Sequence, residues 1–353
     1  MSETKPLLRS LVPAAFADVA AAAGQPRYRG DQLRRWVHGR GALDWQDMGN
    51  LPRAWREELA AAWDLAALAP EARQVSADGT RKFLFRLRDG QHVESVIIPM
   101  ARHATFCISS QVGCAMACRF CATARGGLVR DLEPGEIVEQ VQRLEADLAA
   151  EPVPGHGERS FNVVFMGMGE PLDAWEPVAA SLAIMTDPDG LGMSRRRVRI
   201  STSGPREGLL RLIDAAPGVG LTLSLGGADD ASRRRLMPVP GRTPVAEAVD
   251  LAERYGRAAG RRVTVAWVLI AGRTDDLAQA RLLARLLAGR PFKVNLIPMN
   301  PLHDDALDRP ARKNTLAFQQ VLTDAGVPAF IRESGGRDID AACGQLRRRR
   351  TGA

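Results

Sequence analysis

Apolar side chains recur at helical spacing through the first sixty residues. The stretch RGDQLRRWVHGRG, residues 29–41, places Leu33, Trp36 and Val37 on one face of a helix. The stretch LPRAWREELAAAWDL, residues 51–65, repeats this pattern and has Pro52 near its start, a position that helices tolerate. We therefore predict a compact helical unit over residues 1–65.

Two strands are predicted next, in TRKFLFRLRDGQHVESVIIP, residues 80–99. Apolar-rich runs flank Asp89 and Gly90, and Asp-Gly between such runs is a strong signal for a hairpin turn. We expect this hairpin, within a linker over residues 66–99, to lead into the core.

From residue 100 onward, strand-like and helix-like segments alternate. The predicted strands are ATFCIS, FNVVFMG, RVRIST, GLTLSL, RVTVAWVLI, FKVNLIP and PAFIRES. The predicted helices are 134–150, 174–186, 205–215, 244–258, 275–288 and 314–325, the first with Pro134 at a tolerated position.

This alternation predicts an α/β fold with a parallel sheet, whose site residues gather at the C-terminal ends of the strands. Six or seven units are too few for a closed eight-stranded barrel. We predict an incomplete barrel over residues 100–338, open on one side for a large substrate. A C-terminal loop over residues 339–353 follows it.

Composition places the chain among globular proteins of the cytoplasm. Of its 353 residues, 45% are hydrophobic and 25% are charged, which allows a sizeable core. No apolar run approaches the ~18–20 residues that a membrane span requires. The start MSETKPLLRS lacks the apolar stretch of a signal peptide. We expect a cytoplasmic protein with reduced thiols and no membrane partner.

The net charge of +7 is carried almost entirely by arginine. The arginines cluster at 27–35, 195–199, 233–235 and 347–350. Several basic clusters on one chain favour nucleic acid as a partner. A solvated surface with a compositional bias toward arginine explains the charge equally well.

Four of the five cysteines lie in CISSQVGCAMACRFCATA, residues 107–124. Cys114, Cys118 and Cys121 have the spacing Cys-x-x-x-Cys-x-x-Cys and follow the first predicted core strand. Three thiolates hold three irons of a four-iron cluster, which ordinarily takes four cysteines. The fourth iron then keeps an open position, where S-adenosylmethionine could chelate through its amino and carboxylate groups.

Zinc and a purely structural role are the alternatives for this loop. Structural zinc sites normally have four ligands, often in paired Cys-x-x-Cys motifs. The chain has no second cysteine pair, and its five histidines form no ligand-spaced cluster. The spacing therefore favours an iron–sulfur cluster.

The chain resembles the RlmN/Cfr family of radical S-adenosylmethionine RNA adenine methyltransferases. The resemblance runs from about residue 27 to 346. It rests on five motifs in matching order: CISSQVGCAMACRFCATA, GMGEP, ISTSG, NLIPMNP and DIDAACGQL. It implies a (β/α)6-type radical S-adenosylmethionine barrel with Cys114, Cys118 and Cys121 as ligands of one [4Fe-4S] cluster.

The resemblance also implies a set of cofactor contacts at the predicted strand ends. These residues are Gly169, Glu170, Ser201, Ser224, Leu225, Gly226 and Asn300. Gly169 and Glu170 would contact the methionine end of S-adenosylmethionine. Serine and asparagine also occur in turns without binding anything, and Glu170 would equally serve as a helix-capping acid before Pro171.

Cys343 and Cys107 are implied to carry the methyl-transfer chemistry. Carbon 2 of adenine is not nucleophilic, so an electrophilic methyl group cannot be transferred to it directly. In the family, the residue matching Cys343 becomes S-methylcysteine and is converted to a carbon radical that adds to the base. The residue matching Cys107 then forms a transient disulfide with it and releases the product. The alternative is a buried strand cysteine and a loop cysteine.

Glu94 lies on the second strand of the predicted hairpin. The matching family residue is assigned as a proton acceptor, and a desolvated carboxylate could serve as such a base. The alternative is a strand glutamate that faces solvent.

Two departures from the family pattern bear on the substrate. The family usually has Ser-Leu-His where this chain has Ser224, Leu225 and Gly226. It usually has Arg-Gly-Asp-Asp where this chain has Gly335, Gly336, Arg337 and Asp338. These changes leave the reaction class intact and indicate a divergent branch of the family.

The sequence thus predicts an enzyme that methylates carbon 2 of adenine in 23S ribosomal RNA, with transfer RNA as a second substrate. The alternatives are methylation of adenine carbon 8 or of another RNA, a radical enzyme for peptides or small molecules, and an RNA-binding protein with a structural cluster. We expect a monomer that takes electrons from a donor such as flavodoxin or ferredoxin.

Overall fold

The computed structural model describes residues 5–153, 161–215, 217–239, 243–301 and 307–346. Its α-helices are α1 (Ala15–Ala22), α2 (Arg27–Arg34), α3 (Arg53–Ala62), α4 (Ala122–Arg125), α5 (Pro134–Ala150), α6 (Trp175–Thr186), α7 (Arg206–Ala215), α8 (Asp230–Leu236), α9 (Val245–Ala258), α10 (Leu277–Leu287) and α11 (Arg312–Asp324). Short helical turns are η1 (Leu8–Ser10), η2 (Arg35–Gly39), η3 (Trp45–Asp47), η4 (Arg195–Arg197) and η5 (Arg337–Ile339). The strands are β1 (Leu68–Val75), β2 (Arg81–Leu87), β3 (His92–Pro99), β4 (Ala104–Cys107), β5 (Gln111–Gly113), β6 (Leu128–Asp131), β7 (Phe161–Phe165), β8 (Val198–Thr202), β9 (Gly220–Ser224), β10 (Val263–Leu269), β11 (Phe292–Pro298) and β12 (Ala329–Ile331).

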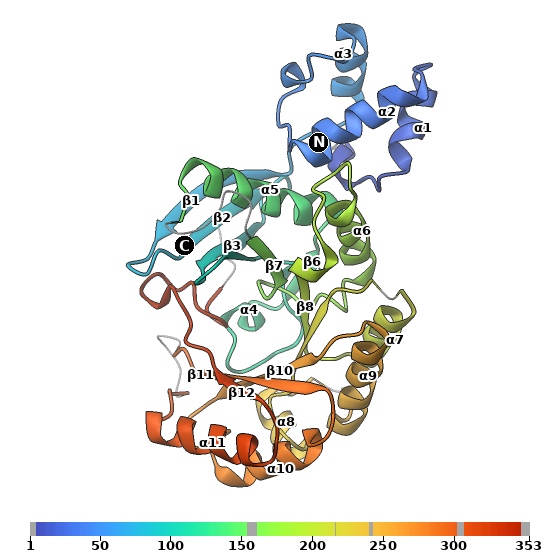
Figure 1. Ribbon diagram of the computed structural model, residues 1–353. Coiled ribbons are helices and arrows are strands. Elements are labelled where there is room, and N and C mark those ends of the chain that lie inside the picture. The colour runs from blue at the N-terminus through green and yellow to red at the C-terminus, as the bar shows by residue number, and fades with distance from the viewer. Residues whose placement is uncertain (1–4, 154–160, 216, 240–242, 302–306, 347–353) are drawn as a thin grey trace.

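One long curved sheet organises the chain, in the order β1-β2-β3-β4-β7-β8-β9-β10-β11-β12. Strand β4 pairs with β7 in parallel, and from β7 to β12 each strand runs parallel to the next in sequence, while β5 and β6 form a separate pair. The connecting helices lie along the outside of the curve, and α4 lies at its centre (Figure 1). This confirms the predicted α/β fold with a parallel core and an open barrel.

Every strand and helix predicted in the core forms within a few residues of its expected bounds. The predicted hairpin is also present, but a third antiparallel strand, β1, pairs with β2 and extends the sheet. Strand β1 has mostly exposed side chains and a register shift next to Pro70. A polar edge strand of this kind lacks the apolar alternation on which the prediction depended.

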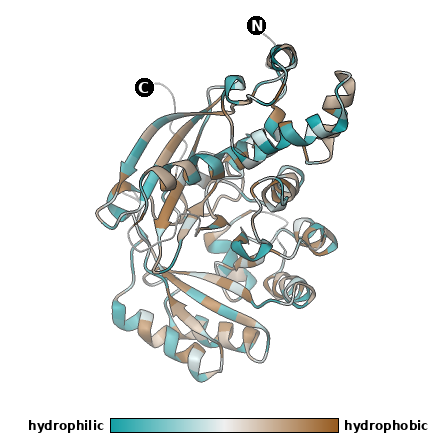
Figure 2. Cartoon of the chain, turned by 45° about the horizontal axis from the view of Figure 1, so that its top comes forward, coloured by the Kyte–Doolittle hydropathy of each residue, from teal (hydrophilic) through white to brown (hydrophobic). Residues whose placement is uncertain are grey.

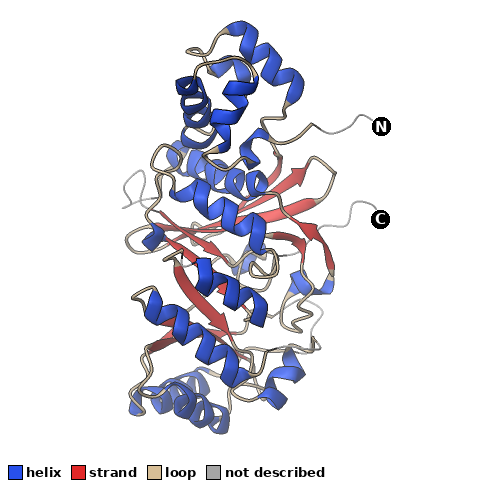
Figure 3. Ribbon diagram, turned by 90° about the vertical axis from the view of Figure 1, so that its right-hand side faces the viewer, coloured by secondary structure: helices blue, strands red, loops and turns tan. Residues whose placement is uncertain are grey.

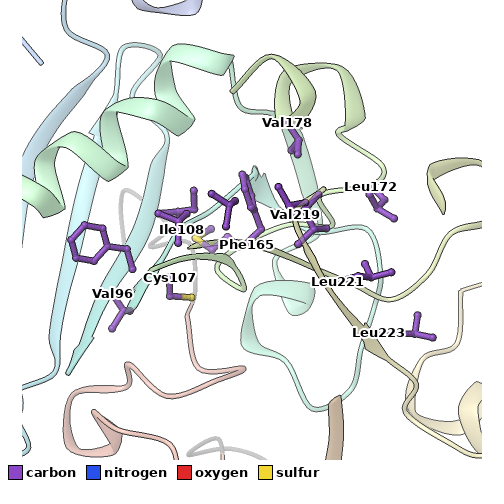
Figure 4. Packing of buried hydrophobic residues seen from close by; sticks show 14 of the residues in the cluster. Val96, Cys107, Ile108, Phe165, Leu172, Val178, Val219, Leu221 and Leu223 are labelled. Carbon is purple, nitrogen blue, oxygen red and sulfur yellow. The ribbon is translucent and has the colours of Figure 1, made fainter. Parts of the chain in front are cut away.

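Burial alternates along β7, β8 and β11, as in a barrel whose inner and outer faces differ. In β7, Phe161, Val163 and Phe165 are buried, whereas the residues between them are only partly buried. The buried set packs in the main apolar cluster with the helices. Figure 4 shows this packing, with Cys107 of β4 close to Val96 and Phe165.

The helices surround the sheet and shield its outer face. Figure 2 shows apolar residues on the strands and a mixture of polar and apolar residues along the helices around them. Figure 3 shows the helices stacked in a column along one side of the strands, with the N-terminal helices at one end. Among the described residues, none of the helices is long and apolar enough to cross a membrane.

The N-terminal helices have an apolar cluster of their own, centred on Phe16, Leu33 and Trp55. Arg9 is fully buried where this cluster meets α5. Its guanidinium donates to the carbonyl oxygens of Val37 and Ala42 at 2.8 and 2.9 Å, and to the side chain of Gln142 in α5. A buried guanidinium is stable only when such partners replace its water. Arg9 therefore ties the N-terminal helices to the barrel.

His38 makes the stability of this junction depend on pH. It is fully buried, and its Nε2 atom lies 3.2 Å from the carbonyl oxygen of Arg9. Burial lowers the pKa of His38 to about 3. The unfolded chain binds a proton near pH 6.5, whereas the folded chain does so only near pH 3. Stability therefore falls as pH drops through this window, by ~1.4 kcal/mol per pH unit.

We predict that acidification from pH 8 to pH 5 costs the wild type about 2 kcal/mol more than a His38→Gln variant, because glutamine removes the titrating group. Urea unfolding curves of both proteins at both pH values measure this difference. Equal losses of unfolding free energy in the two proteins would contradict this prediction, because they would show that the pKa of His38 is the same in the folded and unfolded chains.

Candidate active site

A cavity of about 180 Å³ opens at the C-terminal ends of the parallel strands. It is lined by the three clustered cysteines, by strand ends and by the C-terminal loop. The lining residues that sequence predicted are Cys114, Cys118, Cys121, Gly169, Glu170, Ser201, Ser224, Asn300 and Cys343. Residues more than 200 positions apart in sequence thus meet at one place, because parallel strands all end on the same side of the sheet.

The cysteine loop is shaped by the small antiparallel pair β5–β6, which flanks it. Gly113 has a φ of +81°, and a Cβ atom there would lie 1.9 Å from the carbonyl oxygen of Gly127. Only glycine allows the two strands to close beneath the loop. Across the cavity, the Arg119 amide donates to the carbonyl oxygen of Leu236 at 2.9 Å. The cysteine loop is therefore fixed by the β5–β6 pair and by the hydrogen bond between Arg119 and Leu236.

The GMGEP segment packs directly on the backbone that leads into the cysteine loop. The Gly167 amide donates to the carbonyl oxygen of Ile108 at 3.0 Å, and the Ser110 amide donates to that of Met168 at 2.8 Å. A Cβ atom on Gly167 would lie 2.6 Å from the Ile108 oxygen. Gly169 has a φ of +107°, and a Cβ atom there would lie 2.7 Å from both the Gln111 Cβ and the Ser110 Oγ. These glycines allow two strand ends to interlock.

Glu170 is buried beside this interlock and is held by several donors. Its carboxylate accepts hydrogen bonds from the Thr202 hydroxyl at 2.6 Å, the Ser203 amide at 2.7 Å and the Leu172 amide at 3.1 Å. The side chain thus joins the ends of β7 and β8 at the cavity wall. A carboxylate fixed in this way can accept from one further donor, such as a ligand's amino group.

The C-terminal loop places Cys343 next to the cysteine loop. The Ala122 amide donates to the carbonyl oxygen of Gly344 at 2.7 Å. The side-chain amide of Asn300 donates to the carbonyl oxygen of Cys343 at 3.2 Å and to the Ser334 hydroxyl at 3.0 Å. Cys343 is therefore anchored from β11 and from α4.

Cys107 and Cys343 are electrostatic neighbours. Burial raises the pKa of Cys107 well above its ordinary value, and the charge of Cys343 raises it further. Cys343 is exposed at the cavity opening, yet the protein around it excludes enough water to raise the pKa of its thiol. The Ser334 hydroxyl and the charge of Cys121 also act on Cys343. Cys121 and Cys343 line the cavity, whereas Cys107 is buried in β4 and is not among the lining residues.

Glu94 is buried on β3 and lies outside the set of residues that line the cavity. Its Oε1 atom is 3.5 Å from the Lys82 Nζ, which also donates to the carbonyl oxygen of Asp340 at 3.3 Å. The alternative of a solvent-facing glutamate is therefore wrong. Through Lys82, Glu94 is connected to the loop that carries Cys343.

Leu225 and Gly226 lie behind the cavity wall. Leu225 is fully buried, and neither residue is among those that line the cavity. Gly226 has a φ of +69°, and a Cβ atom there would lie 2.4 Å from the Met237 Sδ. Met237 itself lines the cavity, so a thioether occupies the space that a side chain at position 226 would need.

The second departure lies where the C-terminal loop meets the β1–β2 turn. A Cβ atom on Gly335 would lie 2.6 Å from the Thr80 Oγ1, and the Gly336 amide donates to Asp78 at 2.9 Å. Arg337 is exposed and lies 3.9 Å from Glu333. The basic tail at residues 347–350 lies outside the described residues.

Sequence reasoning missed several cavity residues, among them Met116, Thr202, Ser203, Met237 and Met299. Thr202 and Ser203 lie within ISTSG, so the strand-end argument could have included them. The methionines carry no motif signal, because methionine is also the ordinary filler of irregular cores.

The cavity fits the cofactors that the sequence predicts. Burial raises the pKa of Cys114, whereas a thiol bound to a metal stays deprotonated even when it is buried. Among the described residues, no three or more His, Cys, Asp or Glu side chains are close enough together to bind one metal ion as mononuclear ligands. The Oδ1 atom of Asn300 is buried at the cavity wall without a hydrogen-bond partner in the described structure. A ligand with a donor group would satisfy it.

Comparison with known proteins agrees with this geometry. Residues 108–283 match the family model of the radical SAM superfamily, and residues 8–64 match that of the ribosomal RNA large subunit methyltransferase N-terminal domain. A probable dual-specificity RNA methyltransferase RlmN from Symbiobacterium thermophilum is 43% identical over 95% of this chain and 89% of its own length. The dual-specificity RNA methyltransferase RlmN from Sorangium cellulosum is 41% identical over 95% of this chain and 94% of its own.

The crystal structure of a radical SAM methyltransferase from Sphaerobacter thermophilus superposes with a TM-score of 0.90 at 39% identity. The match covers 97% of this chain and 99% of that one. The chain therefore belongs to the RlmN family of radical SAM RNA methyltransferases.

Proposed function

We propose that this enzyme methylates carbon 2 of adenine in 23S ribosomal RNA, and in transfer RNA as a second substrate. The observation that carries the proposal is the meeting of four cysteines around one cavity, with a fifth buried on β4 nearby. Cys114, Cys118, Cys121 and Cys343 line the cavity. Cys107 is the buried last residue of β4 and does not line it. A cluster that only supported an RNA-binding fold would not need Cys107 and Cys343. The similar proteins from other organisms are named as dual-specificity RNA methyltransferases.

In this proposal, Cys114, Cys118 and Cys121 hold a [4Fe-4S] cluster that leaves one iron for S-adenosylmethionine. Together these cofactors supply a methyl group and an organic radical. Glu170, Ser201 and Asn300 bind and orient S-adenosylmethionine, because their polar atoms converge on the cavity from three strand ends. A small electron-transfer protein such as flavodoxin or ferredoxin supplies the reducing electron to the monomeric enzyme.

Cys343 carries the methyl group as a thioether. One hydrogen atom of this methyl group would pass to the organic radical that the bound cofactors supply, and the remaining carbon bonds to carbon 2 of the adenine. The electron that the adduct loses would return to the bound cluster. Glu94 accepts the ring proton, and Lys82 ties it to the C-terminal loop, since the Lys82 Nζ lies 3.5 Å from the Glu94 Oε1 and donates to the Asp340 carbonyl oxygen. The Cys107 thiolate then attacks the Cys343 sulfur. A disulfide forms, the bond from this sulfur to the methylene carbon breaks, and the released carbon takes up a proton. An external thiol reduces the disulfide before the next turnover.

The substrate base has to leave its stack to reach this cavity. The apolar side chains of Phe120, Val268 and Ile297 lie in the wall, together with methionine thioethers. Such a wall favours a flipped-out, desolvated base. We place the RNA strand across the open side of the barrel.

Deletion of the gene in its host tests the product. We expect nuclease digestion and mass spectrometry of ribosomal and transfer RNA to show loss of 2-methyladenosine. Wild-type protein should restore it, whereas Cys343→Ala should leave less than about 1% of the wild-type level. If the deletion strain lost 8-methyladenosine instead, and wild-type protein restored it, the methylated atom would be carbon 8. Unchanged methyladenosines of both kinds would overturn the proposal.

Removal of Cys107 tests the release step separately. In a Cys107→Ala variant the bond between Cys343 and the base has no thiol to resolve it. We expect an RNA-linked protein that migrates slowly on denaturing gels and is lost on nuclease treatment. The double variant Cys107→Ala/Cys343→Ala is the matched control and should show no such species. An adduct in the double variant would remove Cys343 from the assigned role.

The interlock at Gly169 yields a prediction about cofactor binding. A Gly169→Ala variant places a Cβ atom 2.7 Å from Gln111 and forces φ of +107° on an L-residue. We expect S-adenosylmethionine affinity of the reconstituted protein, measured by equilibrium dialysis, to fall at least about tenfold, or ~1.4 kcal/mol.

Gly126→Ala is the matched control for this substitution. Gly126 lies in the same region with a φ of −81°, and its added Cβ atom would come no nearer than 3.6 Å to the Thr123 oxygen. This variant should bind like the wild type. Equal affinity in Gly169→Ala would show that the interlock does not shape the cofactor site.

A further inference from the structure

A second concave surface lies at the N-terminal ends of the strands, the end of the barrel opposite to the cysteine cavity. It has a volume of about 630 Å³ and is lined by Ser194, Arg195, Arg196, Gly218, Ala259, Gly260 and Arg261. These residues precede β8, β9 and β10, so three adjacent connections form it. We call this surface the barrel floor.

The side chain of Arg195 at the floor packs against a glycine. A Cβ atom on Gly218 would lie 3.7 Å from the Arg195 Cδ, so the arginine stem lies against this glycine. Arg195 and Arg196 are exposed, and Arg261 is partly exposed. Their guanidinium groups are therefore available to a ligand in solution.

More cations lie behind the floor, inside the barrel. Arg199 lies two residues before Ser201 on β8, and Lys293 lies four residues before Ile297 on β11. Ser201 and Ile297 line the cysteine cavity, so all four side chains project to the inner face. The Arg199 guanidinium lies over Gly220, where a Cβ atom would be 3.0 Å from its Cζ.

These interior cations act on one another. Burial and the charges of Arg261 and Arg332 lower the pKa of Arg199. Burial and the charges of Arg199, Arg332 and Arg262 lower the pKa of Lys293. The floor and the inner cations thus form one cationic cluster.

Within the described part of the chain, this cluster has no carboxylate partner. No ion pair joins a carboxylate to Arg195, Arg196, Arg199, Arg261, Arg262, Lys293 or Arg332. Other arginines of the described chain do have such partners, as Arg290 has with Asp250 and Glu253. Like charges gathered without counter-charge repel one another, and a bound anion relieves the repulsion.

Thr222 adds a buried polar group on the same inner face. Its Oγ1 atom is buried without a hydrogen-bond partner in the described structure. Its neighbour Thr264 accepts a hydrogen bond from Arg199 at 3.3 Å, and Arg199 also donates to the Leu221 carbonyl oxygen at 3.0 Å. The floor therefore leads into a polar interior.

We propose that the barrel floor is a second RNA-binding surface, which holds phosphodiester groups of the substrate away from the reacting adenine. Arginine guanidinium groups from two connections, before β8 and before β10, match a run of phosphates better than a single small anion, because they are spread around an open surface. The proposal rests on the proposed RNA substrate. It adds a site on the opposite end of the barrel from the cysteine cavity.

The salt dependence of RNA binding tests this surface. The probe is fluorescein-labelled (U)20, since phosphate contacts do not depend on base sequence. The floor variant is Arg195→Gln/Arg196→Gln/Arg261→Gln in the full chain. Each lost single-strand phosphate contact lowers the slope of log Kd against log salt concentration by ~0.7. We expect a slope lower by about 2 and a Kd at 0.15 M salt at least about tenfold higher.

The matched control removes the same charge from helices on the outside of the barrel. It is Arg206→Gln/Arg211→Gln/Arg281→Gln, all three exposed residues of α7 and α10. We expect its slope to stay within about 0.5 of the wild-type slope. Circular dichroism checks that both variants are folded. An equal fall in slope for the two variants would mean a general charge effect and would overturn the proposal.

Two other occupants are distinguished in the same experiment. If pyrophosphate raises the Tm of the wild type but not of the floor variant, while the (U)20 slopes agree, the floor binds a small free anion. If labelled poly-glutamate shows the slope loss and (U)20 does not, the partner is an acidic protein. Either result overturns the RNA surface. The readout is binding, so failure of the Cys343 chemistry would leave this result intact.

Discussion

The close approach of two strand ends determines where everything else in the active site lies. The segment after β7 crosses the segment after β4 at a distance that only Gly167 and Gly169 allow. Backbone hydrogen bonds then join Ile108 and Ser110 to this segment along its length. Because both segments are fixed by backbone groups, the cysteine loop and Glu170 cannot move independently. A cofactor that is held by thiolates on one side and by polar groups on the other needs this constraint.

The same logic extends to the end of the chain. The loop after β12 returns across the open side of the barrel and is held at two places. Near Gly336 it docks on the β1–β2 turn, and near Gly344 it docks on α4. Cys343 lies between these anchors. The antiparallel strands β1–β3 therefore do more than extend the sheet, because they support the loop that carries Cys343.

Periodicity was sufficient to predict the barrel. In β7 and β11, buried and partly buried residues alternate, and each of these strands is followed or preceded by an amphipathic helix. Strand β1 was missed because an edge strand needs no apolar face. The gathering of Cys114, Ser201 and Asn300 was also predictable, since parallel strands share one C-terminal edge. The sequence did not predict which strand-end residues face the cavity. Ser224 lines the cavity, whereas its neighbour Leu225 is buried behind the wall.

The two ends of the barrel have different electrostatic character. The wall of the cysteine cavity is formed mainly by thiols, thioethers and apolar side chains. At position 226, where the RlmN/Cfr family usually has histidine, this chain has glycine, and the Met237 thioether occupies the adjoining space. Such a wall holds a base by desolvation and contact, and it contributes little long-range attraction for a polyanion. The cationic cluster of the barrel floor lies at the opposite end. In our proposal, the floor attracts RNA phosphates at a distance from the cavity that recognises the base. A large folded RNA can satisfy both requirements at once, whereas a short oligonucleotide that fills only the cavity cannot.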